Sequence, residues 1–400
     1  MERSFGWLWA AYSVSALGTA LALNAFPLVA VLVLHAGPAE VSALAAAGLA
    51  VGAVVAVPLG PWVEFRRKRP VMMAMDLARF ALLLSVPVAY AFDRLSFVQL
   101  LVVSVLVAAA DITFTSASGA CLKGLLPHRD LLVANARFEA TMWTTTMVGP
   151  PLGGAAIGLF GPVVTIAADA VSYLLSAVGI RAMGGHQESR PARPDPGTRL
   201  KARDLLDGWR FILTHPVLRP LFLNALLVNG LIMVGAPLLS VLMLGPLHFA
   251  PWQFSLAFAV PCVGGLIGSR LSRRLVARYG PHKVLVTAGT LRACWPLGLA
   301  FIGPGVPGLL LVMVIELGLI TCIGVFNPVL ATLRLEHTPT DRLARTLSAW
   351  SISSKLTIAA LTALWGLLAT LTTPRAALTA AGLLLLATPA LLGRRALPPD

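Results

Sequence analysis

The sequence predicts an all-α membrane protein with twelve transmembrane helices in two pseudo-symmetric six-helix halves. Of its 400 residues, 57% are hydrophobic and only 12% are charged, whereas soluble domains carry about 25% charged residues. The apolar residues form runs of the length that crosses a bilayer as a helix, about 20 residues. The runs of the second half also repeat those of the first at a nearly constant offset.

Twelve apolar runs lie between clusters of turn-forming and charged residues. The first is too long for the apolar part of a signal peptide, so we expect it to remain as a span. The turns after Phe160 and Ile302 are short, so the alternative is that the number of spans differs from twelve by one. The predicted spans are 7–34, 41–63, 70–92, 97–120, 134–159, 162–183, 217–244, 251–271, 281–302, 306–333, 344–370 and 374–392.

The basic residues indicate the orientation of these spans. If both termini are cytoplasmic, 26 of the 31 lysines and arginines lie on the inner side and only Arg94 and Arg375 lie in outer loops. Positive residues are retained on the cytoplasmic side during insertion. The net charge of +14 is therefore explained by topology, and we expect no nucleic-acid partner. A composition rich in Ala, Leu, Gly, Pro and Arg is typical of a high-GC bacterium, which predicts a multi-pass protein of the bacterial cytoplasmic membrane.

A polar stretch after the sixth span divides the chain. Residues 184–216 contain a Pro-, Gly- and charge-rich linker, followed by the amphipathic "LLDGWRFILTHP". We therefore predict an N-terminal bundle over 1–183, a cytoplasmic linker with one surface helix, and a C-terminal bundle over 217–400.

The two predicted bundles repeat each other. "PLVAVLVL" at 27–34 matches "PLLSVLML" at 237–244 in five of eight positions, and Arg79 and Phe114 correspond to Arg292 and Phe326 at offsets of 213 and 212. Matches in the same order at one offset indicate an internal duplication. Duplicated halves around a site at the membrane midplane are typical of alternating-access transporters.

Ionisable side chains inside the spans are the first candidates for function, because each costs several kcal/mol at membrane depth. Asp111 has no nearby base in the sequence and is our first candidate for a proton-binding acid; Glu139 lies at a similar level. A carboxyl group in an apolar cavity can bind and release a proton near neutral pH. Glu316 and Lys355 each lie about ten residues, roughly 15 Å, inside their spans. For Glu316, a permanent bridge to Lys355 or Arg292 is the alternative to proton binding.

Two other acids are expected to be structural. Asp76 and Arg79 stand three residues apart on one helix and can pair with each other. Asp169 is expected to form a packing or capping hydrogen bond. Amides and aromatic side chains complete the set of residues that could line a substrate cavity. These candidates are Asn24, Phe26, Trp143, Asn229, Phe326, Asn327 and Trp350.

Two motifs resemble those of the major facilitator superfamily of transporters. "GPWVEFRRKR" at 60–69 resembles its loop between spans two and three, with matches at Gly60, Glu64, Lys68 and Arg69. The family's usual aspartate is a glutamate here, the arginine after it is Phe65, and the loop glycine is Arg67.

"MVGPPLGG" resembles the core of the family's fifth-span motif, associated with proton-coupled exporters. The matching residues are Gly149, Pro150, Gly153 and Gly154, while Thr145 replaces an upstream glycine. We expect Pro150 to bend this span and the glycines to allow close approach of a neighbouring helix, as a seal or rocking contact between the halves. The surrounding sequence resembles the branch of macrolide-efflux and enterobactin-exporter proteins among drug:proton antiporters.

This resemblance implies the major facilitator fold and a monomer that works by alternating access. Spans one, four, seven and ten line the cavity in this superfamily, which favours Asp111 and Glu316 as proton sites. The implied function is the export of a hydrophobic or amphipathic small molecule, such as an antibiotic or other natural product, in exchange for protons. A siderophore exporter or a lipid flippase of the same fold is the alternative.

Other classes of protein find no support in the sequence. It contains no HExxH, GxSxG or Walker motif, so we expect neither an enzyme nor a pump driven by ATP. The four cysteines form no CxxC pair, so we expect no disulfide framework, no metal site and no cofactor. The expected partners are the small-molecule substrate, protons and membrane lipid.

Overall fold

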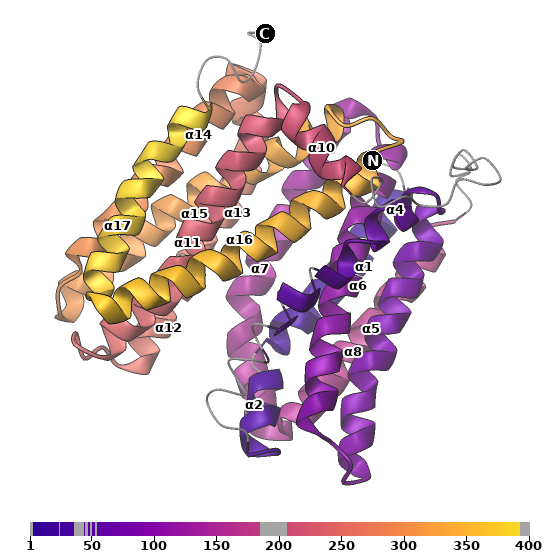
Figure 1. Cartoon of the computed structure of the whole chain (residues 1–400), viewed down its shortest axis with the longest axis horizontal. Coiled ribbons are helices and arrows are strands. Elements are labelled where there is room, and N and C mark those ends of the chain that lie inside the picture. The colour runs from indigo at the N-terminus through magenta and orange to yellow at the C-terminus, as the bar shows by residue number, and fades with distance from the viewer. Residues whose placement is uncertain are drawn as a thin grey trace. The chain divides into compact units, whose positions relative to one another are not determined.

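The computed structural model describes residues 3–23, 25–35, 44, 47–48, 50–52, 54–184 and 206–392. Within these residues every regular element is a helix, which confirms the predicted all-α class (Figure 1). Nine of the described helical segments are long and apolar enough to cross a membrane. Helix α7 (His128–Phe160) has the length but not the mean hydropathy, because it contains several threonines, glycines and prolines. Twelve spans therefore remain a prediction.

Five predicted spans are interrupted within the described residues. The second, 41–63, is interrupted by a turn at Val57 and Pro58 before α4 (Leu59–Glu64). The first is divided into α1 (Arg3–Leu21) and α2 (Ala25–Leu32), and the eighth into α12 (Pro251–Ala259) and α13 (Cys262–Tyr279). The ninth and twelfth change to 3-10 helix in their last turns. A proline lies at each of the last three changes, at positions 261, 296 and 389, and removes one backbone hydrogen-bond donor.

The starts of several helices follow from local sequence. Gly161 and Gly280 both have positive φ, 84° and 80°, and each directly precedes a proline at the first position of a helix. Glycine adopts this backbone conformation without a steric penalty, and proline at the first helical position lacks only a donor that would have had no partner. Ser96 and Thr373 cap α6 and α17, since their hydroxyls accept hydrogen bonds from Gln99 and Ala376 backbone N–H groups.

The chain forms two compact units. The first comprises Met1–Leu131, Val148–Ile212 and Thr338–Lys355. Within it α5 lies between α6 and α8, and α1 packs on α8 (Figure 1). Its apolar core includes Leu83 and Ile166. Its helices are α1, α2, α4 (Leu59–Glu64), α5 (Lys68–Ala91), α6 (Phe97–Leu125), the second part of α7, α8 (Pro162–Ala182), most of α10 (Asp207–Thr214) and the first part of α16 (Leu343–Leu371).

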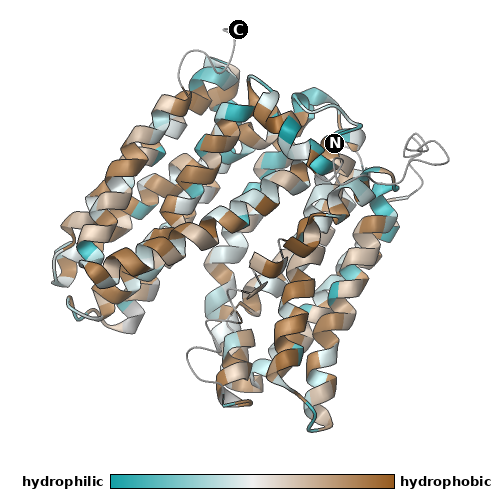
Figure 2. Cartoon of the chain, in the orientation of Figure 1, coloured by the Kyte–Doolittle hydropathy of each residue, from teal (hydrophilic) through white to brown (hydrophobic). Residues whose placement is uncertain are grey.

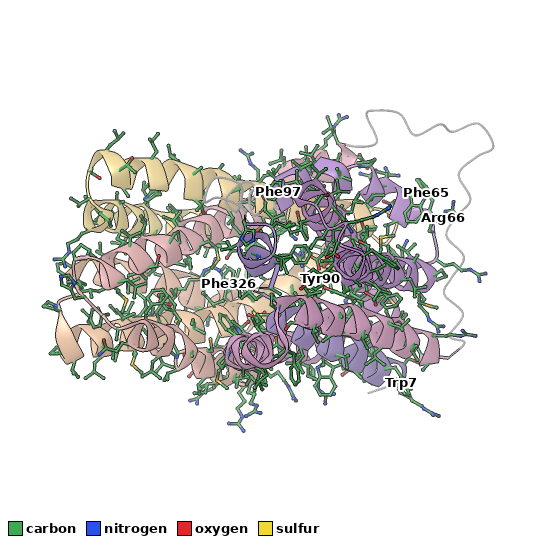
Figure 3. The ribbon with its side chains drawn as sticks, turned by 90° about the horizontal axis from the view of Figure 1, so that it is seen from below. Trp7, Phe65, Arg66, Tyr90, Phe97 and Phe326 are labelled. Carbon is green, nitrogen blue, oxygen red and sulfur yellow. The ribbon has the colours of Figure 1, made fainter. Side chains whose placement is uncertain are left out.

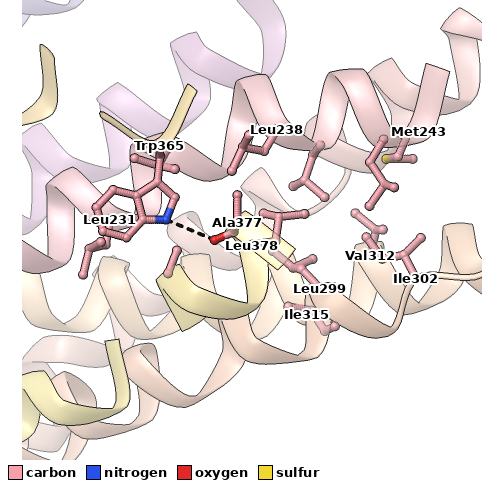
Figure 4. Close-up of a cluster of buried hydrophobic side chains, with 14 of the residues drawn as sticks. Leu231, Leu238, Met243, Leu299, Ile302, Val312, Ile315, Trp365, Ala377 and Leu378 are labelled. Carbon is pink, nitrogen blue, oxygen red and sulfur yellow. Dashed lines mark hydrogen bonds between the residues drawn. The ribbon is translucent and has the colours of Figure 1, made fainter. Parts of the chain in front are cut away.

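The second unit comprises Leu132–Met147, Leu213–His337 and Leu356–Asp400. Helix α15 is central and contacts α12, α13, α14 and η1. Its core gathers leucine, valine and isoleucine side chains around Trp365, whose indole Nε1 donates a hydrogen bond to the Ala377 carbonyl oxygen over 3.0 Å (Figure 4). Its other helices are α11 (Leu218–Leu244), α12, α13, α14 (Pro281–Cys294), η1 (Trp295–Phe301), α15 (Gly305–Glu336), the remainder of α16, α17 (Pro374–Ala387) and η2 (Thr388–Leu392).

These units divide the chain differently from the predicted bundles. Residues 132–147 of α7 group with the second unit, and residues 338–355 group with the first. The predicted boundaries, 1–183 and 217–400, therefore remain a prediction. Hydrophobic residues dominate the helix bodies (Figure 2), and many large apolar side chains are exposed, Leu159, Phe301 and Leu371 among them. Such side chains suit contact with lipid tails, which are as apolar as leucine.

Candidate functional site

A network of charged side chains runs through the first unit. Asp76 and Arg79 on α5 form a buried ion pair, as their spacing predicts. The Ser176 hydroxyl of α8 donates a second hydrogen bond to Asp76 over 2.7 Å. Arg79 also donates to Asp111 of α6 over 3.4 Å. The pair predicted to be structural is therefore connected to the first proton-site candidate.

Lys355 of α16 supplies the second cation at Asp111. Its Nζ donates to Asp111 Oδ2 over 3.0 Å. The prediction that no base neutralises Asp111 is wrong, because Arg79 and Lys355 reach it from other helices. The Asp111 side chain is 46% exposed, against 26% for Lys355, so this ion pair is accessible rather than sealed in the core.

The second unit repeats half of this arrangement. The Arg79 guanidinium lies 4.6 Å from the centre of the Phe114 ring, and Arg292 lies 3.4 Å from that of Phe326. The residues that correspond by sequence offset therefore form the same kind of cation–aromatic contact in both units. Arg292 has no acidic partner among the described residues and donates instead to Asn224 Oδ1 over 2.6 Å. The ring is therefore common to both units, and the Asn224 amide takes the place of the acids.

Glu316 stands apart from both networks. It is buried on α15 and forms no hydrogen bond or ion pair with the described residues. The alternative of a bridge to Lys355 or Arg292 finds no support among the described residues, since Lys355 bonds Asp111 and Arg292 bonds Asn224.

Glu139 of α7 contacts two other predicted candidates, Trp143 and Asn327. Glu139 Oε1 accepts hydrogen bonds from Trp143 Nε1 over 3.0 Å and from Asn327 Nδ2 of α15 over 2.9 Å. No cation among the described residues pairs with this carboxylate. The Trp143 ring covers Gly265 of α13, where an added Cβ would overlap the indole. Glu139 is thus held by neutral donors at the point where three helices meet.

The remaining cavity candidates are more scattered. Phe26 packs on the apolar core of the first unit, whereas Phe326 and Trp350 are buried. Asn229 of α11 is half-buried and its amide forms no hydrogen bond with the described residues. Asn24 lies outside the described residues. Figure 3 labels Phe326 among the surrounding side chains.

The motif at 60–69 contacts the beginning of α16. Glu64 at the end of α4 lies 2.8 Å from Arg345 Nε, and Arg345 also reaches Asp207 of α10 over 3.4 Å. A Cβ added at Gly60 would lie 2.9 Å from that of Ser348, so only glycine permits this approach. Burial raises the pKa of Glu64 from 4.5 to about 7, and Arg345 and Lys68 offset only part of this effect.

Two basic residues of the same motif donate hydrogen bonds to backbone carbonyl oxygens at helix ends. The Lys68 ammonium donates to the carbonyl oxygens of Val63, Glu64 and Arg66. Arg69 donates to three carbonyl oxygens at the end of α8. Phe65 and Arg66, labelled in Figure 3, follow α4 directly, and Phe65 lies under the Arg345 guanidinium.

The glycines of the fifth-span motif differ in what they contact. Added Cβ atoms at Gly149 and Gly153 would overlap Ala20 and the Leu21 carbonyl of the first predicted span. Gly154 has no such neighbour within 4 Å. The predicted close approach is confirmed for two glycines, but the neighbour belongs to the same predicted bundle. These two contacts lie within one predicted bundle, so the expected seal or rocking contact between the halves remains a prediction. Helix α7 continues through Pro150, and its bend remains a prediction.

Three residues that form these contacts were not predicted from the sequence. Arg345, Asp207 and Ser176 each bind a partner more than 90 residues away. Only the charge of Arg345 and Asp207 near the ends of apolar runs gave a signal, and it does not identify a partner.

Known proteins resemble the chain in sequence and in fold. The sequence profile of the Major Facilitator Superfamily matches residues 8–325 and 237–400. The multidrug efflux pump Tap of Mycolicibacterium fortuitum is 27% identical over 304 residues, which cover 73% of this chain and 71% of the pump. Tap of Mycobacterium tuberculosis (strain ATCC 25618 / H37Rv) is also 27% identical, over 72% of this chain and 68% of the pump.

Solved structures share the fold at low identity. A bacterial homologue of the iron transporter ferroportin, in an outward-facing state, superposes with a TM-score of 0.83 at 15% identity, over 98% of both chains. The human organic anion transporter MFSD10 gives a TM-score of 0.79 at 17% identity, over 98% of this chain and 100% of that one. The profile match covers most of the chain, and the fold agrees with it. The chain therefore belongs to the Major Facilitator Superfamily and is a multi-pass membrane transporter.

Proposed function

We propose that the chain exports a hydrophobic or amphipathic small molecule, such as an antibiotic or other natural product, in exchange for protons. The observation that carries this proposal is Glu139, a carboxylate in the predicted fifth span that only neutral groups among the described residues hold. Proton uptake there needs no ion pair to break, whereas proton uptake at Asp111 requires displacement of Lys355 or Arg79. We therefore place Glu139 ahead of Asp111 as the proton-binding acid.

Substrate and proton would compete at this carboxylate. Trp143 offers an indole and Asn327 an amide beside Glu139, so an amphipathic molecule could use a flat apolar face and polar groups together. The relatives named multidrug efflux pumps support export as the direction.

The Asp111–Lys355 pair has a different role in this proposal. Both side chains are partly accessible, so the pair faces water rather than lipid if it lies at the membrane midplane. We propose that it changes its partners when the transporter changes state, with Arg79 retaining Asp111 when Lys355 departs. Glu316, with no partner among the described residues, is the second candidate for proton binding.

The contact of Gly60 and Glu64 with Ser348 and Arg345 supports alternating access, while Lys68 and Arg69 hold the neighbouring helix ends. We propose that both termini face the cytoplasm of a bacterial cell and that this contact at the start of α16 opens in each cycle. Gly149 and Gly153 would maintain the packing of α7 on α1 during that change. We further propose a monomer with bundles over 1–183 and 217–400.

Transport in proteoliposomes with an imposed pH gradient tests the proposal. The wild type, Glu139→Gln, Asp111→Asn and Asp93→Asn are compared with a lipophilic cationic dye and a neutral macrolide as substrates. Asp93 is exposed and has a positive φ of 54°, which asparagine tolerates, so it serves as the matched control. We expect gradient-driven accumulation to fall at least 10-fold in Glu139→Gln and to remain within about twofold in the control.

Exchange of labelled for unlabelled substrate without a gradient separates coupling from binding. A variant that lacks only the proton site should retain this exchange. Gradient-driven transport by Glu139→Gln at the wild-type rate would reject Glu139, and loss confined to Asp111→Asn would move the proton site to α6. Wild-type transport that ignores the gradient would contradict proton coupling.

A further inference from the structure

Helix α13 of the second unit, with the start of α14, carries an exposed basic surface whose cations form no ion pair or hydrogen bond with the described residues; Arg278 alone contacts an aromatic ring, that of Tyr279 at 5.2 Å. Arg270, Arg273, Arg274 and Arg278 lie on α13, and Lys283 follows on α14. All five side chains are exposed, and none forms an ion pair or a hydrogen bond with the described residues. The sequence contains no aspartate or glutamate between Asp207 and Glu316. We call these five residues the basic surface.

The packing of α13 fixes this surface outward. The opposite face of the helix carries Gly264, Gly265 and Gly268, which lie directly against the α15 backbone. A Cβ added at Gly264 would lie 2.8 Å from the Leu317 carbonyl oxygen, and one at Gly268 would overlap that of Thr321. Helix α13 therefore has no freedom to turn its arginines inward.

The exposed side of α13 passes from apolar to basic within one turn. Val263 and Ile267 are exposed, and Arg270, Arg274 and Arg278 continue the same helical stripe. At 1.5 Å per residue, these arginines lie about 5 to 17 Å beyond Ile267 along the axis. The polar region of a bilayer leaflet is about 5 to 8 Å thick. If Ile267 lies at the edge of the lipid tails, Arg270 lies among the headgroups, Arg274, about 11 Å beyond Ile267, reaches their outer edge, and Arg278, about 17 Å beyond it, lies outside them.

In the corresponding loop of the first half, at 60–69, three of the cations contact protein groups. Lys68 and Arg69 are occupied by the carbonyl oxygens of helix ends. Arg66 lies over the Trp62 ring. Retention of positive charge on the inner side explains both clusters, but it does not require that one of them remain without partners.

We propose that the basic surface binds the headgroups of anionic phospholipids in the inner leaflet. Guanidinium groups bind phosphate oxygens through paired hydrogen bonds, and basic clusters next to a transmembrane helix attract anionic lipid. Because this part of the chain contains no aspartate or glutamate, we expect lipid phosphate to supply the counter-charge for the basic surface. This inference adds a lipid site to the transporter and does not depend on what the transporter exports.

Displacement of a fluorescent phosphatidylglycerol from the purified full chain in detergent tests the proposal. Unlabelled phosphatidylglycerol and phosphatidylcholine serve as competitors. The test variant is Arg270→Gln/Arg273→Gln/Arg274→Gln. The control is Arg67→Gln/Arg129→Gln/Arg181→Gln, which removes three exposed inner cations that do not cluster on one helix. We expect affinity for phosphatidylglycerol to fall about 10-fold or more in the test variant, since each cation near an anionic surface contributes roughly fivefold. The control should stay within about twofold.

Three results would overturn the proposal. The first is equal loss in both triple variants, which would indicate net charge rather than a site. The second is equal displacement by phosphatidylcholine. The third is displacement by millimolar inorganic phosphate or by an oligonucleotide at the same phosphate concentration, which would identify a soluble anion as the ligand. If the test variant does not fold, as judged by circular dichroism, the single variants Arg270→Gln and Arg274→Gln should each lose about fivefold.

Discussion

The acids of this transporter differ in the side chains that contact their carboxylates. We infer the role of each acid from these contacts. Asp111 faces two cations, Glu139 faces an indole and an amide, and Glu64 faces Arg345 in a buried contact. Spacing alone predicted the Asp76–Arg79 pair, because three residues along one helix bring side chains together. The other partners were beyond prediction from spacing, since Glu139 and Asn327 are 188 residues apart.

Glu64 gives the contact between α4 and α16 a pH dependence. Burial raises the pKa of Glu64 from 4.5 to about 7, so the folded contact favours the protonated acid. Its contribution to stability is fully present below about pH 4.5 and is lost as the pH rises through about 7. We expect the Tm of the wild type in detergent to fall by a few degrees between pH 5.5 and pH 8 through this group, and Glu64→Gln to lack that component. A wild type that instead gains stability over this range relative to Glu64→Gln would show that the ion pair with Arg345 outweighs burial.

At the scale of helices, glycine decides how closely the elements pack. The pairs α7–α1 and α13–α15 both approach through glycines that leave no room for a Cβ. Lipid offers little hydrophobic driving force for helix association, so such close packing contributes much of the binding between helices. The sequence predicted a glycine-lined contact for α7 but not which glycines take part. Neighbouring Gly153 and Gly154 look equivalent in the sequence, and only Gly153 contacts α1.

Alanine substitution at these neighbouring glycines should have opposite effects. Gly153→Ala places a methyl group on the Leu21 carbonyl, so we expect a loss of about 2 kcal/mol or more of stability through overpacking. Gly154→Ala meets no atom within 4 Å and should be neutral or should stabilise by up to about 1 kcal/mol through helix propensity. Thermal unfolding of both variants in detergent measures the difference. Equal stability would mean that α1 and α7 do not pack closely at Gly153.

At the scale of the whole molecule, two long helices belong to both compact units. The first part of α16 joins the first unit and its remainder the second, while α7 is divided in the opposite sense. A helix shared in this way changes its neighbours when either unit rearranges. The beginning of α16 is where Gly60, Glu64 and Asp207 converge on Arg345 and Ser348. Alternating access therefore predicts that this contact opens during each transport cycle.

A reversible cross-link should stop the cycle at this contact. Gly60→Cys and Ser348→Cys place two thiols within reach, because a Cβ at position 60 lies 2.9 Å from that of Ser348 and a small shift gives disulfide geometry. The exposed Cys294 is replaced by serine in the background. Oxidation should abolish transport in proteoliposomes and reduction should restore it, whereas transport by each single cysteine variant should respond to neither oxidation nor reduction. Full transport by the cross-linked protein would contradict opening at this contact.

The sequence by itself determined the fold class, the internal duplication and the set of groups from which a site can be built. These properties depend on local quantities: the length of apolar runs, the position of basic residues and the residue types within each span. Tertiary structure decided which of those groups meet. It brought Lys355 to Asp111 rather than to Glu316, gathered Glu139, Trp143 and Asn327, and left the arginines of α13 without an acidic partner among the described residues. The physical reason is that pairing at membrane depth depends on the rotation and register of packed helices, which contacts distant in sequence determine.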